Sequence, residues 1–149
     1  MLDDIDAKIL EMLAENSHIT ATDLAPLIGL SVPATNKRIN KLSAANIIER
    51  FTVCVSPEEV GKPLLAFINI VLERLTYVDD LLRVLNTDKD ILECFAVAGE
   101  FDYIVKVRAK NMLDLENKIL SIKEIEGVTK TNTIISLYTH KYLPTILPD

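Results

Sequence analysis

Apolar residues recur every three or four positions in the first third of the chain, which is the spacing of helices. Residues 3–16 carry one apolar stripe, formed by Ile5, Ile9, Met12 and Leu13. Residues 20–28 carry a second, formed by Leu24, Leu27 and Ile28, between Thr20 and Gly29. Threonine caps a helix start when an acidic residue such as Asp23 follows three positions later, and glycine favours the left-handed turn at a helix end. The pattern predicts two helices, the second ending in a tight turn.

Ser31 and Pro33 predict the start of a third helix, because serine caps the first N–H groups and proline is tolerated in the first turn. At 100° per residue, one side of that helix carries Val32, Asn36, Ile39 and Ser43. The other side carries Ala34, Lys37, Arg38, Lys41 and Ala45. A helix that packs by one side and offers small and cationic residues on the other fits a DNA major groove.

The stretch from Thr20 to Asn46 therefore predicts a helix-turn-helix that binds double-stranded DNA. Its expected DNA-binding residues are Ser31, Pro33, Ala34, Thr35, Lys37, Arg38 and Lys41. Residues 31–50 hold four cations against Glu49 alone, a net charge of +3 within a chain of net charge −6. A helical hairpin with a solvated basic face would look the same, and so few cations contact few phosphates. Two copies acting together would provide enough cations for DNA binding.

The pattern changes after Asn46, a residue that tolerates the left-handed backbone after a helix. Residues 47–56, IIERFTVCVS, alternate enough to predict a strand or a short ribbon. The next segment, PEEVGKP, holds two prolines and Gly61 and is the best domain boundary in the sequence. We therefore expect a DNA-binding domain over 1–50, a strand and linker over 51–63, and a second domain over 64–149.

The second domain alternates between strand and helix patterns. Strands are predicted at 64–72, 91–98, 102–109 and 129–138, and helices at 78–85 and 112–122. The order β-α-β-β-α-β is that of the ferredoxin-like split unit, so the whole chain is predicted to be α+β. Strand 64–72 is apolar on both faces, whereas two helices cover only one face of such a sheet. We expect another subunit to cover the second face; folding back of the N-terminal unit is the alternative, which the proline-rich linker disfavours.

Composition narrows the class of protein. The 149 residues are 49% hydrophobic and 26% charged, as in a soluble globular protein. No apolar run reaches membrane-spanning length and the N-terminus lacks a signal-peptide layout, which predicts a cytoplasmic protein without a membrane partner. Cys54 and Cys94 lie far apart in apolar stretches and are predicted to be buried reduced thiols. No nucleophile–base pair, phosphate-cradling glycine loop or metal-spaced cluster is present in the sequence, so neither an enzyme nor a metal or cofactor site is expected.

Short motifs across both domains resemble the Lrp/AsnC family, the feast/famine transcriptional regulators of bacteria and archaea. The first half of the resemblance lies in Leu2–Asp6, Ile9–Leu10, Asp23–Ala25, Gly29–Ser31, Lys37–Ile39, Leu42 and Ile47–Ile48. The second half lies in Glu93–Phe95, Gly99–Tyr103 and Lys106–Arg108. The chain departs from the family pattern at Pro26, inside the first helix of the helix-turn-helix, so we expect that helix to be short or kinked.

The resemblance implies a winged helix-turn-helix domain and a ferredoxin-like (RAM-type) domain that forms homodimers, often assembling to octamers. It also implies a sequence-specific regulator whose assembly or DNA affinity responds to an amino acid or a related small molecule. Carried over by position, the effector would bind between dimers and meet Gly99, Glu100, Phe101, Asp102, Thr131 and Thr133. Carboxylates there would accept bonds from its ammonium group, and backbone N–H groups and threonine hydroxyls would donate to its carboxylate.

Three other interpretations stay open at this stage. Asp102 could simply cap a hairpin, with the threonines as ordinary strand residues. The chain could be a DNA-compacting architectural protein without an effector, which would use the same helix with little sequence preference. It could also be a regulatory subunit in amino-acid metabolism.

Overall fold

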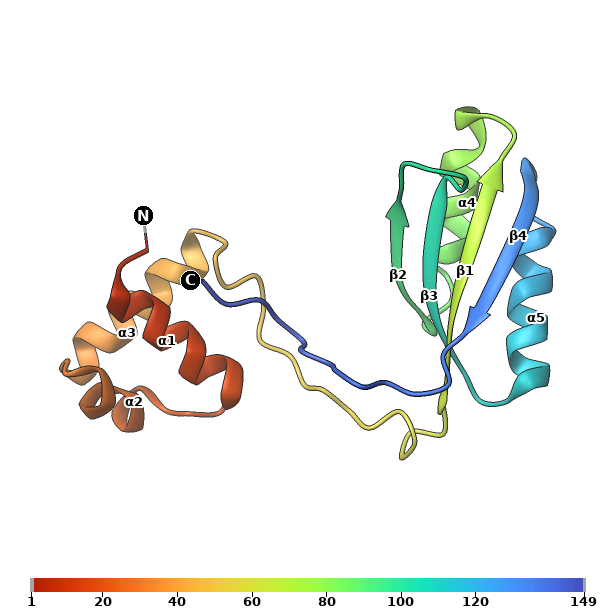
Figure 1. The fold of residues 1–149 in the computed structure, drawn as a ribbon. Coiled ribbons are helices and arrows are strands. Elements are labelled where there is room, and N and C mark those ends of the chain that lie inside the picture. The colour runs from red at the N-terminus through yellow and green to blue at the C-terminus, as the bar shows by residue number, and fades with distance from the viewer. Residues whose placement is uncertain (1, 149) are drawn as a thin grey trace. The chain divides into compact units, whose positions relative to one another are not determined.

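The computed structural model describes residues 2–148 and contains two compact units (Figure 1). The first unit runs to Cys54 and includes the tail from Lys141 onward; the second runs from Val55 to His140. Among the described residues, no helix has both the length and the apolar character needed to cross a lipid bilayer.

Three helices form the first unit: α1 (Asp4–Glu15), α2 (Ala21–Ile28) and α3 (Val32–Ala44). Each begins at a side-chain cap. The carboxylate of Asp3 accepts the N–H of Asp6 at 2.8 Å, the hydroxyl of Thr20 accepts the N–H of Asp23 at 3.2 Å, and the hydroxyl of Ser31 accepts the N–H of Ala34 at 3.4 Å. The predicted caps of α2 and α3 are therefore confirmed. Helix α2 contains Pro26 and spans only eight residues, which agrees with the expectation that this proline makes the helix short or kinked.

The hydrophobic core of this unit is formed by buried residues from all three helices: Ile9, Leu24, Ile28 and Leu42. Ile39 and Leu13 pack against them from partly exposed positions. Left-handed backbone follows both helices of the helix-turn-helix, at Gly29 (φ 70°) and Asn46 (φ 54°). The sequence predicts these two residues for these turns, because glycine and asparagine adopt positive φ most readily.

The strand predicted over 47–56 is wrong for the single chain, since this segment forms no strand in the described structure. A strand needs a neighbour that accepts and donates its backbone hydrogen bonds, and this segment has none within its own chain. The apolar side chains that produced the alternation, Phe51, Val53 and Val55, are exposed instead. Cys54 lies between them and is also exposed, so the prediction that it is buried is wrong.

The second unit has the predicted order β-α-β-β-α-β. Its elements are β1 (Leu64–Leu72), a short 3-10 turn η1 (Leu75–Tyr77), α4 (Val78–Leu85), β2 (Ile91–Ala96), β3 (Tyr103–Ala109), α5 (Met112–Lys123) and β4 (Val128–Ile135). The strands lie in the order β2-β3-β1-β4, and every neighbouring pair is antiparallel. Both helices cover the same face of this sheet (Figure 1).

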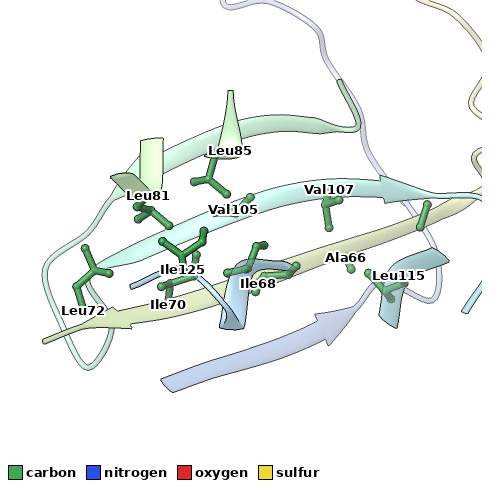
Figure 2. Packing of buried hydrophobic residues seen from close by; sticks show 12 residues of the cluster. Ala66, Ile68, Ile70, Leu72, Leu81, Leu85, Val105, Val107, Leu115 and Ile125 are labelled. Carbon is green, nitrogen blue, oxygen red and sulfur yellow. The ribbon is translucent and has the colours of Figure 1, made fainter. Parts of the chain in front are cut away.

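The core of this unit lies between the sheet and its two helices (Figure 2). Ile68 and Ile70 of β1 and Val105 and Val107 of β3 are completely buried against Leu81 and Leu115 of the helices. Cys94 of β2 packs at the edge of the same core, and burial raises the pKa of its thiol. The second cysteine is therefore an inert, partly buried thiol, close to what the sequence predicted.

The opposite face of the sheet is not covered by any helix of the described chain. The register places Phe67 of β1, Ile104 of β3, Phe95 of β2 and Ile134 of β4 on this open face. Phe95 and Ile134 remain 52% and 56% exposed. A sheet face with this many apolar side chains in water is typical of a surface that another molecule covers.

A cluster of ion pairs fastens the end of the linker to the second unit. Lys62, just before β1, pairs with Asp90, and Lys118 of α5 lies 2.7 Å from Asp88 and 3.0 Å from Asp90. Burial opposes the ionisation of Asp90, but hydrogen bonds from Lys62 and Lys118 outweigh it and lower the pKa of this carboxyl. Burial likewise opposes the charge of Lys118, and hydrogen bonds to Asp88 and Asp90 outweigh it and raise the pKa of the lysine.

Candidate nucleic-acid interface and effector site

Helix α3 packs on α1 and α2 through Thr35 and Leu42, which are 0% and 2% exposed. The Thr35 hydroxyl donates to the backbone oxygen of Ser31 at 3.0 Å, so it is satisfied inside the unit. The sequence predicted Asn36 on the packing side of the helix and Thr35 on the DNA side, whereas the structure has Asn36 exposed and Thr35 buried. Thr35 cannot contact DNA from its buried position. A wheel centred on Leu42, the most apolar position in the helix, would have placed Thr35 inside, since seven residues make two helical turns.

Arg38 is also drawn toward the inside of the unit. Its Nη1 lies 2.7 Å from Asp3 and 2.7 Å from Asp6, whose side chain is 3% exposed. The hydrogen bonds to Asp3 and Asp6 raise the pKa of Arg38, and the bond from Arg38 lowers the pKa of Asp3. The sequence placed Arg38 on the exposed side of the helix, whereas its guanidinium forms ion pairs with α1; its contact with DNA stays a prediction. Its sequence neighbours gave no indication of this pairing, because its partners lie more than thirty positions away.

The outward face of α3 is formed by six exposed residues: Pro33, Asn36, Lys37, Asn40, Lys41 and Ala44. At 100° per residue they fall within one sector of the helix, opposite Thr35, Leu42 and the Arg38 pair. Lys37, Lys41 and Pro33 were predicted for this interface, Ser31 is exposed at its start and Ala34 is half-buried. Asn36 and Asn40 were missed. Asparagine can form two hydrogen bonds with the major-groove edge of adenine, and lysine pairs with phosphates or guanine.

The candidate effector turn joins β2 to β3 over residues 97–102, and its ends are well anchored. The N–H of Val97 donates to the carbonyl of Asp102 at 2.9 Å, and the N–H of Asp102 donates to the carbonyl of Ile70 at 3.0 Å. One carboxylate oxygen of Asp102 accepts the N–H of Leu72 at 2.8 Å. The Asp102 carboxylate therefore has a structural bond to β1, outside the β2–β3 hairpin that the alternative interpretation expected it to cap, and keeps its second oxygen outside that bond.

An ion pair joins the tip of the turn to β4. Glu100 lies 2.8 Å from Lys130, whose ammonium group is 5.3 Å from the centre of the Phe101 ring. Within residues 2–148, the backbone N–H groups of Gly99, Glu100 and Phe101 have no hydrogen-bond acceptor. Beyond Asp102 lies a cavity of about 170 Å³ lined by Leu72, Glu73, Arg74, Leu75, Asp102 and Tyr103.

Thr131 and Thr133 do not join this group within one chain. They pair with Ile70 and Ile68, whose side chains lie under the helices, so both threonines share the helix-covered face. Lys130, which meets Glu100, belongs to the open face. Within one chain, the strand register therefore places the turn's partner Lys130 and the two threonines on opposite faces of the sheet. The expected effector site lies between dimers, so its combination of the turn with the threonines stays a prediction.

Comparison with known proteins identifies both units. Residues 65–146 match the Lrp/AsnC ligand binding domain, and residues 2–49 match a winged helix-turn-helix DNA-binding domain. The chain belongs to the Lrp/AsnC family. The resemblance found in the sequence is thereby confirmed, and this Lrp/AsnC protein is a DNA-binding transcriptional regulator.

Individual relatives of this Lrp/AsnC protein are similar over nearly their whole length. The HTH-type transcriptional regulator FL11 of Pyrococcus furiosus is 34% identical, and the match spans 95% of this chain and 93% of the relative. The structure of AsnC from E. coli has a TM-score of 0.91 at 27% identity, with 99% of each chain covered. A transcriptional regulator from Neisseria meningitidis, solved as a complex with L-methionine, has a TM-score of 0.94 at 27% identity. The match covers 98% of this chain and 96% of the Neisseria chain.

Proposed function

We propose that this Lrp/AsnC regulator recognises a specific DNA sequence through Asn36, Lys37, Asn40 and Lys41, and that an amino acid bound at the 97–102 turn changes its assembly or its DNA affinity. The observation that carries the proposal is the outward face of α3. Two amides and two lysines lie there side by side, all exposed, while the packing side of the same helix is satisfied by Thr35, Leu42 and the Arg38 ion pairs.

The chemistry of this face supports sequence-specific reading. The two lysines supply the phosphate contacts that give affinity without sequence preference. The two asparagines supply base-edge contacts, each good amide–adenine pair contributing about 1–3 kcal/mol of discrimination. Asn36 and Asn40 are four residues apart and so lie one above the other on the helix, a spacing that lets both face one groove.

A homodimer would double this small set of contacts. The open face of the sheet, with Phe67, Phe95, Ile104 and Ile134, offers a large apolar surface for a second copy. A two-fold pair of DNA-binding units suits a DNA site made of two half-sites, as in other helix-turn-helix dimers. Family resemblance extends this expectation to an octamer.

The 97–102 turn offers groups that suit both charged ends of an amino acid. The backbone N–H groups of Gly99, Glu100 and Phe101 suit the carboxylate of an amino acid, and the second oxygen of Asp102 suits its ammonium group. The neighbouring cavity of about 170 Å³ is smaller than the roughly 300–1,000 Å³ of an ordinary ligand site. One chain therefore offers part of a site that a second chain would complete. Two similar solved structures contain L-methionine, which favours an amino acid as the ligand.

Selection of bound genomic DNA fragments by the purified chain, with and without pooled amino acids, tests the proposal. A shared sequence among the selected fragments, and a change in their recovery when amino acids are present, would support it. Equal binding to selected and scrambled DNA at every salt concentration would instead identify an architectural DNA-compacting protein. Calorimetry with each of the twenty amino acids tests the effector separately: if none binds, the regulator works without this effector.

A further inference from the structure

An amide pair lies within the apolar open face of the sheet. The side-chain Nδ2 of Asn69, in β1, donates to the Oδ1 of Asn132, in β4, at 3.2 Å. The two residues are directly opposite in the antiparallel register. Asn69 is only 6% exposed in the single chain, whereas Asn132 is exposed. The pair therefore has one member buried within the sheet surface and one that faces whatever covers it.

Apolar residues surround this pair on the same face. Phe67 and Val71 flank Asn69 along β1, Ile104 lies opposite it on β3, and Ile134 follows Asn132 along β4. Phe95 continues the row from Ile104 to β2. Charged residues of this face form ion pairs: Lys106 lies 2.9 Å from Glu93, and Lys130, two residues before Asn132 on β4, lies 2.8 Å from Glu100. A cover for this face therefore meets a mostly apolar surface with one amide pair inside it.

The two amides retain unused hydrogen-bonding capacity. An asparagine side chain offers two donors and a carbonyl oxygen with two lone pairs, and the described structure uses only one donor of Asn69 and one lone pair of Asn132. In the single chain, the exposed amide of Asn132 leaves its remaining donors and acceptors open to solvent. A cover made only of apolar side chains would exclude that solvent without replacing its bonds, which is unfavourable.

We propose that the Asn69–Asn132 pair selects a second copy of this chain as the cover of the open face and fixes the register in which the two sheets meet. This inference rests on the self-assembly proposed above. A two-fold axis brings the same surface from both copies together. We place that axis beside the amide pair, where the free Nδ2 donors of Asn132 in one copy face the identical pair in the other. An amide pair is self-complementary, because each side chain carries both a donor and an acceptor. A buried polar pair of this kind penalises every shifted register, since a shift places the amides against apolar side chains.

Leucine substitutions provide the test, because leucine has the branched shape of asparagine without its polar atoms. The variants are Asn69→Leu, Asn132→Leu and the double variant, with Asn117→Leu on the exposed surface of α5 as the matched control. The dissociation constant of self-association is measured for the full chain by sedimentation over a dilution series. Circular dichroism of each variant establishes that the fold is kept; Asn132→Leu, at an exposed position on an edge strand, provides a variant that does not disturb the buried layer.

Each single variant should weaken self-association by roughly 10- to 100-fold, because the remaining amide is buried without a partner. The double variant should recover most of this loss, and Asn117→Leu should match the wild type. Register is read from the distance between spin labels on the two copies, attached to Asn117→Cys with Cys54 and Cys94 changed to serine. That distance should be narrowly distributed with the pair intact and broad in the double variant.

Three results would overturn the inference. A dimeric wild type whose affinity is unchanged by either single variant would remove the amides as determinants while leaving the proposed dimer intact. Losses that simply multiply in the double variant would show that the two amides do not act as a pair. A wild type that stays monomeric at every concentration would overturn the proposed self-assembly itself, and this inference with it.

Discussion

The guanidinium of Arg38, midway along α3, lies 2.7 Å from the buried carboxylate of Asp6 in α1. The same nitrogen lies 2.7 Å from Asp3, which also caps α1 by accepting the N–H of Asp6. One side chain therefore joins the start of α1 to the middle of α3. The pairing lies on the packing side of α3 with Thr35 and Leu42, opposite the two asparagines and two lysines that face outward.

Replacement of Asp6 by alanine should lower the free energy of unfolding of the first unit by about 1.5–3 kcal/mol, the usual contribution of a hydrogen bond to a charged group. Urea unfolding followed by circular dichroism measures the change. Asp4→Ala is the matched control, because Asp4 is an exposed neighbour in the same first turn. Equal reductions for the two variants would show that the ion pair with Arg38 contributes nothing to stability.

Replacement of Lys37 or Lys41 by alanine should weaken binding to all DNA sequences similarly. The slope of log affinity against log salt should fall by about 1 for each phosphate that the variant no longer neutralises. Fluorescence anisotropy at several salt concentrations measures this slope. Lys8→Ala, an exposed position on α1, should leave the slope as in the wild type. A slope unchanged by both α3 variants would place the phosphate-binding residues elsewhere.

Stability should fall in acid because the carboxyls of Asp3 and Asp90 have pKa values below the ordinary value of 3.8. For a lowered pKa, the stabilisation is complete above the unfolded value and is lost as the pH falls through the folded value. The loss should therefore occur below about pH 4. Asp90→Asn should remove part of this pH dependence in the second unit, as measured by thermal unfolding between pH 6 and pH 2.

Stability should also fall in alkali, where the group concerned is a lysine with a raised pKa. The pKa of Lys118 is raised above 10.5, so its stabilisation is complete below that pH and is lost as the pH rises through the folded value. Lys118→Met should be less stable than the wild type at pH 7, and the difference should shrink above about pH 10.5. A difference that stays constant through this range would show that the charge of Lys118 is not the cause.

Position 127 requires glycine for two reasons, its positive φ and the closeness of the Tyr77 side chain. Its φ of 85° is unfavourable for other residues, and a Cβ there would lie 2.2 Å from Cγ of Tyr77. Gly127→Ala should destabilise the second unit by about 1–3 kcal/mol. Gly61→Ala is the matched control, because Gly61 has a φ of 73° with nothing within 4 Å of the added carbon. The loss of stability at Gly127 should exceed that at Gly61; equal losses would exclude a role for Tyr77.

The sequence predicted the elements well because their causes are local. Strand β1 and helix α4 have the predicted bounds, 64–72 and 78–85, since their apolar periodicity and boundary residues lie within the segments themselves. The caps at Thr20 and Ser31 and the left-handed Asn46 depend on neighbours within four positions. Such features can be read from any sequence that contains them.

The errors concern contacts between distant segments. Arg38 is drawn inward by Asp3 and Asp6, which only the packed unit brings to it. Thr131 and Thr133 lie on the helix-covered face of their own chain, a placement that depends on the pairing of β4 with β1. The strand predicted over 47–56 lacks a neighbour within its own chain. In each case the residue types were compatible with the prediction, and the partner decided the outcome.

The most direct test of the central claim, that the outward face of α3 reads DNA sequence, compares affinities for a selected DNA site and for its scrambled version. The ratio is measured for the wild type, Asn36→Ala and Asn40→Ala, with Asn117→Ala in the other unit as the control. Removal of one amide–base pair should reduce the ratio by about 1–3 kcal/mol, roughly 5- to 150-fold, and leave binding to scrambled DNA nearly unchanged. A ratio equal to that of the wild type in both α3 variants would contradict the claim.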